Sequence, residues 1–95
     1  MHEKAMNSIY RARAARAMTG CQSNRLYVIG RLPQIATRRQ SIMERYAIND
    51  HAALQAIDSC DAERRATLSL YRSYINELHY ANRGLALACC GKRLP

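Results

Sequence analysis

The chain has 95 residues, a formal net charge of +8 at pH 7, and neither tryptophan nor phenylalanine. A chain of this length forms one small domain, in which a deep, water-excluding active site is difficult to build. No stretch approaches the roughly 18 apolar residues that a membrane-spanning helix requires. We therefore expect residues 1–95 to form a single soluble domain.

The charge is unevenly distributed along the chain. Residues 1–45 contain nine Lys and Arg residues and two acids, whereas residues 46–95 contain six and five. Thirteen of the fifteen basic residues are arginine, whose rigid fork of donors suits phosphate and carboxylate groups. The N-terminal half is therefore predicted to meet an anionic partner.

The composition favours an all-α fold, because alanine is frequent and there are only two prolines and four glycines. We expect about four helices. The first covers residues 3–18 and ends at Thr19 and Gly20. Arg13 interrupts its apolar stripe, so this side chain must either extend to solvent or meet an acidic partner.

Residues 19–33 are predicted to be a mobile loop. Ser23, Asn24 and Gly30 are helix breakers within it, and Pro33 disfavours helical geometry in the residue before it. Pro33 is also suited to the first position of a helix. We therefore expect a second, basic and amphipathic helix from residue 34 to residue 46.

The last two expected helices differ in length. Asn49 and Asp50 are good N-caps for a short third helix, which residues 58–61 interrupt. The fourth and longest covers residues 62–82, and Gly84 is placed to cap its end. Its apolar side chains recur every three or four residues, which is typical of a helix that packs lengthwise on another. We expect it to pack on the second helix.

The residues available for chemistry do not form a recognisable site. The four cysteines, Cys21, Cys60, Cys89 and Cys90, contain no CxxC pair and have no histidine at ligand spacing. The chain also has no phosphate-binding glycine loop and no serine or cysteine in a nucleophile setting. We predict free thiols, no metal, no cofactor and no enzymatic activity.

The candidate binding residues are the arginines of the N-terminal half, with Tyr10 and Tyr27 as anchors beside them. These arginines are Arg11, Arg13, Arg16, Arg25, Arg31, Arg38, Arg39 and Arg45. They suit contacts to nucleic-acid phosphates, which would make binding depend steeply on salt. They equally suit an acidic protein surface, with the tyrosines filling pockets. The sequence leaves both uses open.

A small, arginine-rich, helical chain without a catalytic motif resembles the accessory proteins with which bacteriophages disarm or redirect host enzymes. In size and charge it is similar to the anti-RecBCD proteins of lambdoid phages. The resemblance implies an inhibitor that binds a host nuclease and helicase of DNA recombination in the bacterial cytoplasm. It also implies recruitment of a host prolyl isomerase, for which Pro33 is the internal candidate. The alternative is a small protein that binds DNA or RNA directly.

Overall fold

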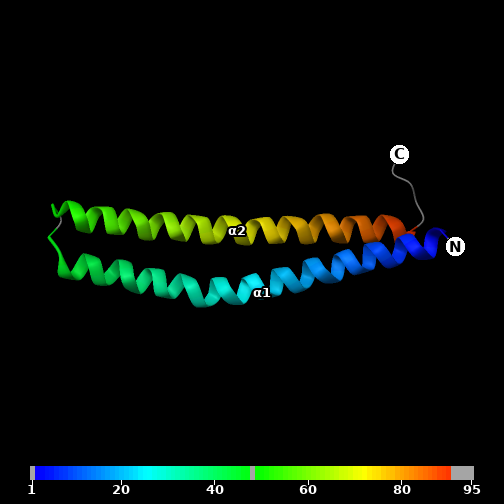
Figure 1. The fold of residues 1–95 in the computed structure, drawn as a ribbon, viewed down its shortest axis with the longest axis horizontal. Coiled ribbons are helices and arrows are strands. Elements are labelled where there is room, and N and C mark those ends of the chain that lie inside the picture. The colour runs from blue at the N-terminus through cyan, green and yellow to red at the C-terminus, as the bar shows by residue number, and fades with distance from the viewer. Residues whose placement is uncertain (1, 48, 91–95) are drawn as a thin grey trace. The chain divides into compact units, whose positions relative to one another are not determined.

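The fold consists of two long helices. The structure is a computed structural model that describes residues 2–47 and 49–90. Helix α1 spans His2–Arg45 and helix α2 spans His51–Cys90 (Figure 1). The all-α class is confirmed, but the expected division into about four helices is wrong. Neither helix is long and apolar enough over its described residues to cross a membrane.

The turn between the helices closes through local hydrogen bonds. The Tyr46 amide donates to the Ile42 carbonyl at 3.2 Å, and the Asp50 amide donates to the Ala47 carbonyl at 3.0 Å. The Asp50 carboxylate then accepts a hydrogen bond from the Ala53 amide at 3.1 Å. Asp50 is therefore the N-cap of α2, as the sequence predicted.

The predicted loop over residues 19–33 is wrong, because α1 continues through it. Pro33 lies inside the helix with its ring exposed. An interior proline costs about 3 kcal/mol in a helix. Val28 and Ile35 are buried on either side of it, and this packing over-rides the local preference of the chain.

Helix α2 likewise passes through residues 58–61, where an interruption was expected. Cys60 is only 1% exposed, and Asp61 pairs with Arg39 of α1. Polar residues that look like a helix start in sequence thus serve contacts between helices. Gly84 does not cap the helix, because α2 extends to Cys90.

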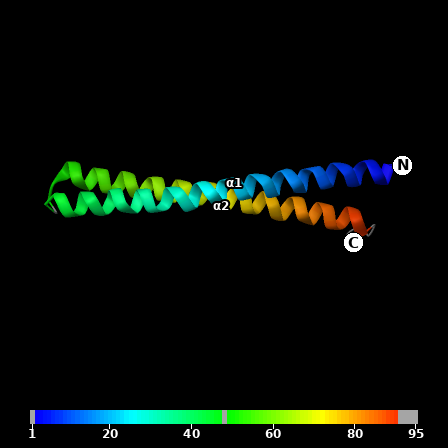
Figure 2. The ribbon, with the colours of Figure 1, turned by 90° about the horizontal axis from the view of Figure 1, so that it is seen from below.

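The chain divides into two compact units, described one at a time. The first unit holds the described residues up to Asn24 and from Arg72 onward, and the second holds Arg25–Tyr71. In the first unit the N-terminal part of α1 and the C-terminal part of α2 lie side by side and antiparallel (Figures 1 and 2). The cluster between them consists of Ala14, Ala17, Ala81, Leu78 and Leu85.

Two glycines in the first unit lie under tyrosine rings. A Cβ atom added to Gly20 would be 3.2 Å from the Tyr74 ring of the other helix, and one added to Gly84 would be 3.3 Å from the Tyr10 ring. Each helix therefore contributes one glycine and one tyrosine to a reciprocal arrangement. These glycines allow close approach of a ring to the backbone, whereas the sequence had suggested helix ends.

The second unit is a helical hairpin with a narrow core. Its buried residues are Val28 and Ile35 from α1, and Ala53, Cys60 and Thr67 from α2. The Thr67 hydroxyl donates to the Glu63 carbonyl at 2.7 Å, which satisfies a buried polar group within its own helix. Small side chains dominate this core.

Residues 62–82 were expected to pack along the second predicted helix, but only the beginning of this region does so. The segment 34–45 reaches the beginning of that region, where Arg38 pairs with Glu63. From Arg72 onward the same region belongs to the first unit, with the predicted first helix. Antiparallel helices place residues near the turn beside one another and pair the early part of α1 with the late part of α2.

Candidate functional site

Arginines and acids form a cluster in the second unit. Arg31 and Arg38 each place an Nη2 atom 2.7 Å from the same Glu63 Oε2 atom. The Nε atom of Arg39 lies 2.9 Å from Oδ1 of Asp61. Three of the arginines predicted to bind a partner therefore pair with acids of the same chain.

The electrostatics of this cluster favour its charged form. The hydrogen bond from Arg38 is the main factor that lowers the pKa of Glu63, and the charges of Arg38 and Arg31 add to it. The pKa of Arg38 is raised by its hydrogen bond to Cys60 Sγ, at 3.4 Å, and by its contact with Glu63. Glu63 is therefore an anion that joins α2 to α1 through its ion pairs with Arg31 and Arg38.

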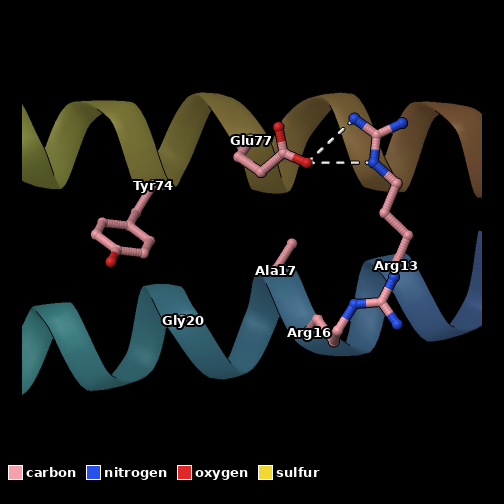
Figure 3. Close-up of a pocket in the computed structure, with 6 residues that line it drawn as sticks. All are labelled: Arg13, Arg16, Ala17, Gly20, Tyr74 and Glu77. Atoms are coloured by element: carbon pink, nitrogen blue, oxygen red, sulfur yellow. Dashed lines mark hydrogen bonds and ion pairs between the residues drawn. The ribbon is translucent and has the colours of Figure 1, made fainter.

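The first unit contains a shallow recess of about 380 Å³. Arg13, Arg16, Ala17 and Gly20 of α1 line it together with Tyr74 and Glu77 of α2 (Figure 3). Arg13 crosses to the other helix, where its Nε and Nη2 atoms donate to Glu77 Oε1 at 3.2 and 3.1 Å. The expectation that Arg13 extends to solvent or meets an acidic partner is resolved in favour of the acid.

Arg16 differs from Arg13. It keeps its guanidinium on the α1 side of the recess (Figure 3) and forms no ion pair among the described residues. The Tyr74 ring lies opposite, above Gly20. Arg16 is therefore a free cation at the end of the recess away from the Tyr74 ring (Figure 3), and it suits a carboxylate or phosphate group.

The eight predicted arginines therefore fall into two groups of four. Arg13, Arg31, Arg38 and Arg39 pair with acids of α2. The other four are exposed and have no ion pair in the part of the chain that the structure describes. They are Arg11, Arg16, Arg25 and Arg45.

The other predicted residues also take different positions. Tyr10 is half-buried against Gly84, whereas Tyr27 is 55% exposed. Pro33 is exposed in the middle of α1 and does not lie in a loop. Of the two tyrosines, only Tyr27 has most of its surface available.

The cysteines serve mainly as small packing residues. Cys21 and Cys60 are buried and free, and Cys89 is exposed and free. The side chain of Cys90 lies outside the described part. Over residues 2–47 and 49–90, no three His, Cys, Asp or Glu residues gather in a group that could hold a metal ion.

Sequence reasoning missed Asp61, Glu63 and Glu77 as partners of arginines. Asp61 belongs to the segment 58–61 that was expected to interrupt the helix, and Glu63 lies two residues beyond it. The sequence did indicate the partner of Arg13. This cation interrupts an apolar stripe, and in that position it needs either solvent or an acidic side chain. If the two halves of the sequence are aligned as antiparallel helices, Glu77 lies beside Arg13.

No protein-family model, no curated protein and no solved structure matches this chain.

Proposed function

We propose that the protein is a non-enzymatic binding protein that docks on an acidic surface of a larger protein. The observation that carries this proposal is the division of the arginines. Half of the predicted set is neutralised within the chain, and the other half is exposed without a partner among the described residues. The paired arginines hold the helices together, and the unpaired ones remain available for an external anion.

Apolar surface beside the free cations favours a protein partner. Tyr74 lines the same recess as Arg16 and is 37% exposed, and Ile9 is 64% exposed about two turns before Arg16 on α1. Contacts to a phosphate backbone need cations but no apolar anchors, whereas protein interfaces combine arginine with aromatic and aliphatic anchors. The first unit therefore suits an acidic segment that carries an apolar side chain.

The partner that the sequence resemblance suggests is a host enzyme that processes nucleic acid, with the RecBCD nuclease and helicase as the first candidate. In this proposal the arginines steer the encounter and the anchors set its lifetime. Docking would inhibit or redirect the enzyme in the bacterial cytoplasm. Recruitment of a prolyl isomerase through Pro33 is a separate part of the proposal.

Direct binding of DNA or RNA is the alternative, and one observation favours it. Tyr27 is 55% exposed in the second unit and lines a recess together with Arg31. An exposed tyrosine beside an arginine suits a base stacked on the ring and a phosphate on the guanidinium. In this case each phosphate contact on duplex DNA makes the slope of log affinity against log salt more negative by about 0.9.

The test compares two triple variants with equal net charge. The site variant carries Arg11→Gln, Arg16→Gln and Arg25→Gln. The control carries Arg64→Gln, Arg72→Gln and Arg83→Gln, which are also exposed and without an ion pair among the described residues. Each protein is immobilised and offered purified host recombination nuclease, and then nuclease-treated bacterial lysate, at two salt concentrations.

A protein-docking function predicts retention after nuclease treatment, a loss of more than about tenfold in the site variant, and little change in the control. Loss of all retention with nuclease, together with binding of bare DNA or RNA that the site variant weakens more than the control does, would contradict it. That result would establish the nucleic-acid alternative through its salt dependence.

A further inference from the structure

A second shallow recess in the first unit is built from α2 alone. It measures about 340 Å³ and is lined by Asn76, His79, Tyr80 and Arg83. All four side chains are exposed, and none forms a hydrogen bond or ion pair among the described residues. Arg72 lies one turn before Asn76 on the same side of the helix and is likewise exposed and unpaired there. We call these five residues the Tyr80 face.

Tyr80 is the most exposed of the six tyrosines, all of which the structure describes. It is 64% exposed, whereas Tyr27, the next, is 55% exposed. The rings of Tyr10 and Tyr74 rest on glycines of the opposite helix, but the chain provides no such cover for Tyr80. A ring in this position contributes little to packing and leaves a flat π-face for a planar partner.

The charge of the Tyr80 face is positive. From Arg72 to the end of α2 the sequence contains one acid, Glu77, and this acid is paired with Arg13 of α1. Arg72 and Arg83 therefore keep charges that no described side chain compensates. The helical rise places their backbones about 16 Å apart, one on each side of Tyr80 along the axis. An extended anion that lies along α2 can meet both arginines and the ring between them.

The side chains of this recess match the parts of a nucleotide. The Arg83 guanidinium suits a phosphate, and the Asn76 amide and the His79 ring can donate and accept hydrogen bonds as base edges do. The recess has no aliphatic side chain in its lining, whereas the centre of a protein interface is apolar. The lining therefore favours a nucleic acid over an acidic protein segment.

Stacking on Tyr80 also selects the form of the nucleic acid. Bases inside a duplex are covered by their neighbours, whereas bases in single strands and loops are free to stack on an aromatic side chain. Such stacking tolerates every base, because each has a π-face. The geometry thus favours a single strand without a strict sequence preference.

We propose that the Tyr80 face binds single-stranded nucleic acid, with a base stacked on Tyr80 and phosphates of the same strand on Arg72 and Arg83. Asn76 and His79 contact the edge of the stacked base or the adjoining sugar. This binding uses none of the N-terminal arginines and does not rest on the proposed docking function.

The first test measures binding of a short labelled oligothymidine to the full chain by fluorescence anisotropy. Tyr80→Ala should weaken binding by about fivefold or more, because it removes the stacking surface. Tyr80→Phe keeps the ring and should stay within about twofold of the unsubstituted chain. Tyr27→Ala is the matched control, because it removes an exposed ring from α1, and it should leave the affinity unchanged.

The second test concerns the phosphates. Arg72→Gln and Arg83→Gln should each weaken binding, and each should make the slope of log affinity against log salt less negative by about 0.7. Arg64→Gln removes the same charge from α2 in the second unit, where it is exposed and unpaired among the described residues. This control should leave the slope nearly unchanged. All these positions are exposed, so the variants should fold like the unsubstituted chain.

Several results would overturn the assignment. One is the absence of oligothymidine binding at low salt, and another is equal affinity of Tyr80→Ala and Tyr80→Phe. Equal binding of an abasic oligomer or of polyglutamate would show a basic surface that takes any extended anion, an acidic protein segment included. Equal binding of a duplex would exclude selection of a single strand.

The triple variants of the docking test distinguish the two surfaces. The control of that test lacks Arg72 and Arg83, so it should lose oligothymidine binding and keep nuclease-resistant retention of a host protein. The site variant keeps both arginines and should show the reverse. Failure of the docking function therefore leaves the Tyr80 face standing, and failure of oligothymidine binding leaves docking untouched.

Discussion

The two units hold the same two helices together by different means. The first unit relies on shape, with alanines in its buried cluster and two tyrosine rings that rest on glycines. Among the side chains of this unit that the structure describes, one ion pair joins the helices, Arg13 with Glu77. The second unit buries Val28 and Ile35 beside small residues, and three arginine–carboxylate pairs lie at its margins.

This difference determines which side chains of each unit remain available for binding. Where small residues bring the helices close, few charges are needed to hold them, and Arg16 remains free. Where the core is narrow and bordered by charges, Arg31, Arg38 and Arg39 are occupied, and Arg25 and Arg45 have no ion pair among the described residues. Each unit therefore keeps two of the eight predicted arginines available for an external anion, which are Arg11 and Arg16 in the first and Arg25 and Arg45 in the second.

The largest expected effect is in the aliphatic core of the second unit. Ile35 is 2% exposed, so Ile35→Ala removes buried methyl groups and leaves a cavity. It should lower the free energy of unfolding by about 2–4 kcal/mol. Denaturant unfolding at a fixed chain concentration measures this. Leu26→Ala, at a residue 72% exposed, is the control and should change stability by less than about 0.5 kcal/mol. Equal effects at the two positions would show that Ile35 is not in a tight core.

The corresponding change in the first unit tests close approach. Ala81 is fully buried, so Ala81→Leu has no space and should destabilise the chain by about 1–3 kcal/mol. Ala86→Leu places the same side chain at an exposed position of the same helix and should be nearly neutral. Thermal unfolding followed by circular dichroism compares the two. A stabilised Ala81→Leu variant would mean that the helices are not closely packed there.

A smaller effect separates packed glycines from open ones. Nothing lies within 4 Å of a Cβ added to Gly30, so Gly30→Ala should stabilise the helix by about 0.5–1 kcal/mol. Gly20→Ala and Gly84→Ala should gain less or lose stability, because the new methyl group meets a tyrosine ring. Measured under the same conditions, an equal gain at all three glycines would contradict the Tyr10 and Tyr74 contacts.

The smallest expected effect concerns the exposed ion pairs of the second unit. The pKa of Glu63 is lowered in the folded chain, so its stabilisation is present above its unfolded pKa of about 4.3 and is lost as the pH falls through the lower folded value. The unsubstituted chain should therefore exceed Glu63→Gln in stability at pH 7, and this advantage should disappear once the pH is below the lowered folded pKa of Glu63. High salt at pH 7 should also reduce it. An advantage that persists at low pH would assign the effect of Glu63 to packing.

The sequence predicted some local features well because local chemistry decides them. Asp50 caps α2 through its own carboxylate, and the apolar stripe of the first helix required compensation at Arg13. The sequence-based prediction failed where the local conformational preference of a residue conflicts with its contacts to distant residues. Gly20 and Pro33 are helix breakers by propensity, yet both lie inside α1. The distant Tyr74 ring and the buried neighbours Val28 and Ile35 decide otherwise.

The candidate site shows the same limit. The arginines were identified from composition, but which of them are available depends on acids more than 20 residues away in sequence. Arg38 and Arg16 are chemically identical, and only Arg38 has Glu63 within reach.

The sequence by itself determined an all-α chain with an excess of arginine in its first half and no catalytic or metal-binding motif. Tertiary structure alone decided that the helices number two, that glycines lie under tyrosines, and that four of the eight arginines are neutralised. The physical reason is that helix propensities are worth about 1 kcal/mol per residue or less, proline apart. Contacts between helices, summed along their length, exceed these local preferences and select which charges remain exposed.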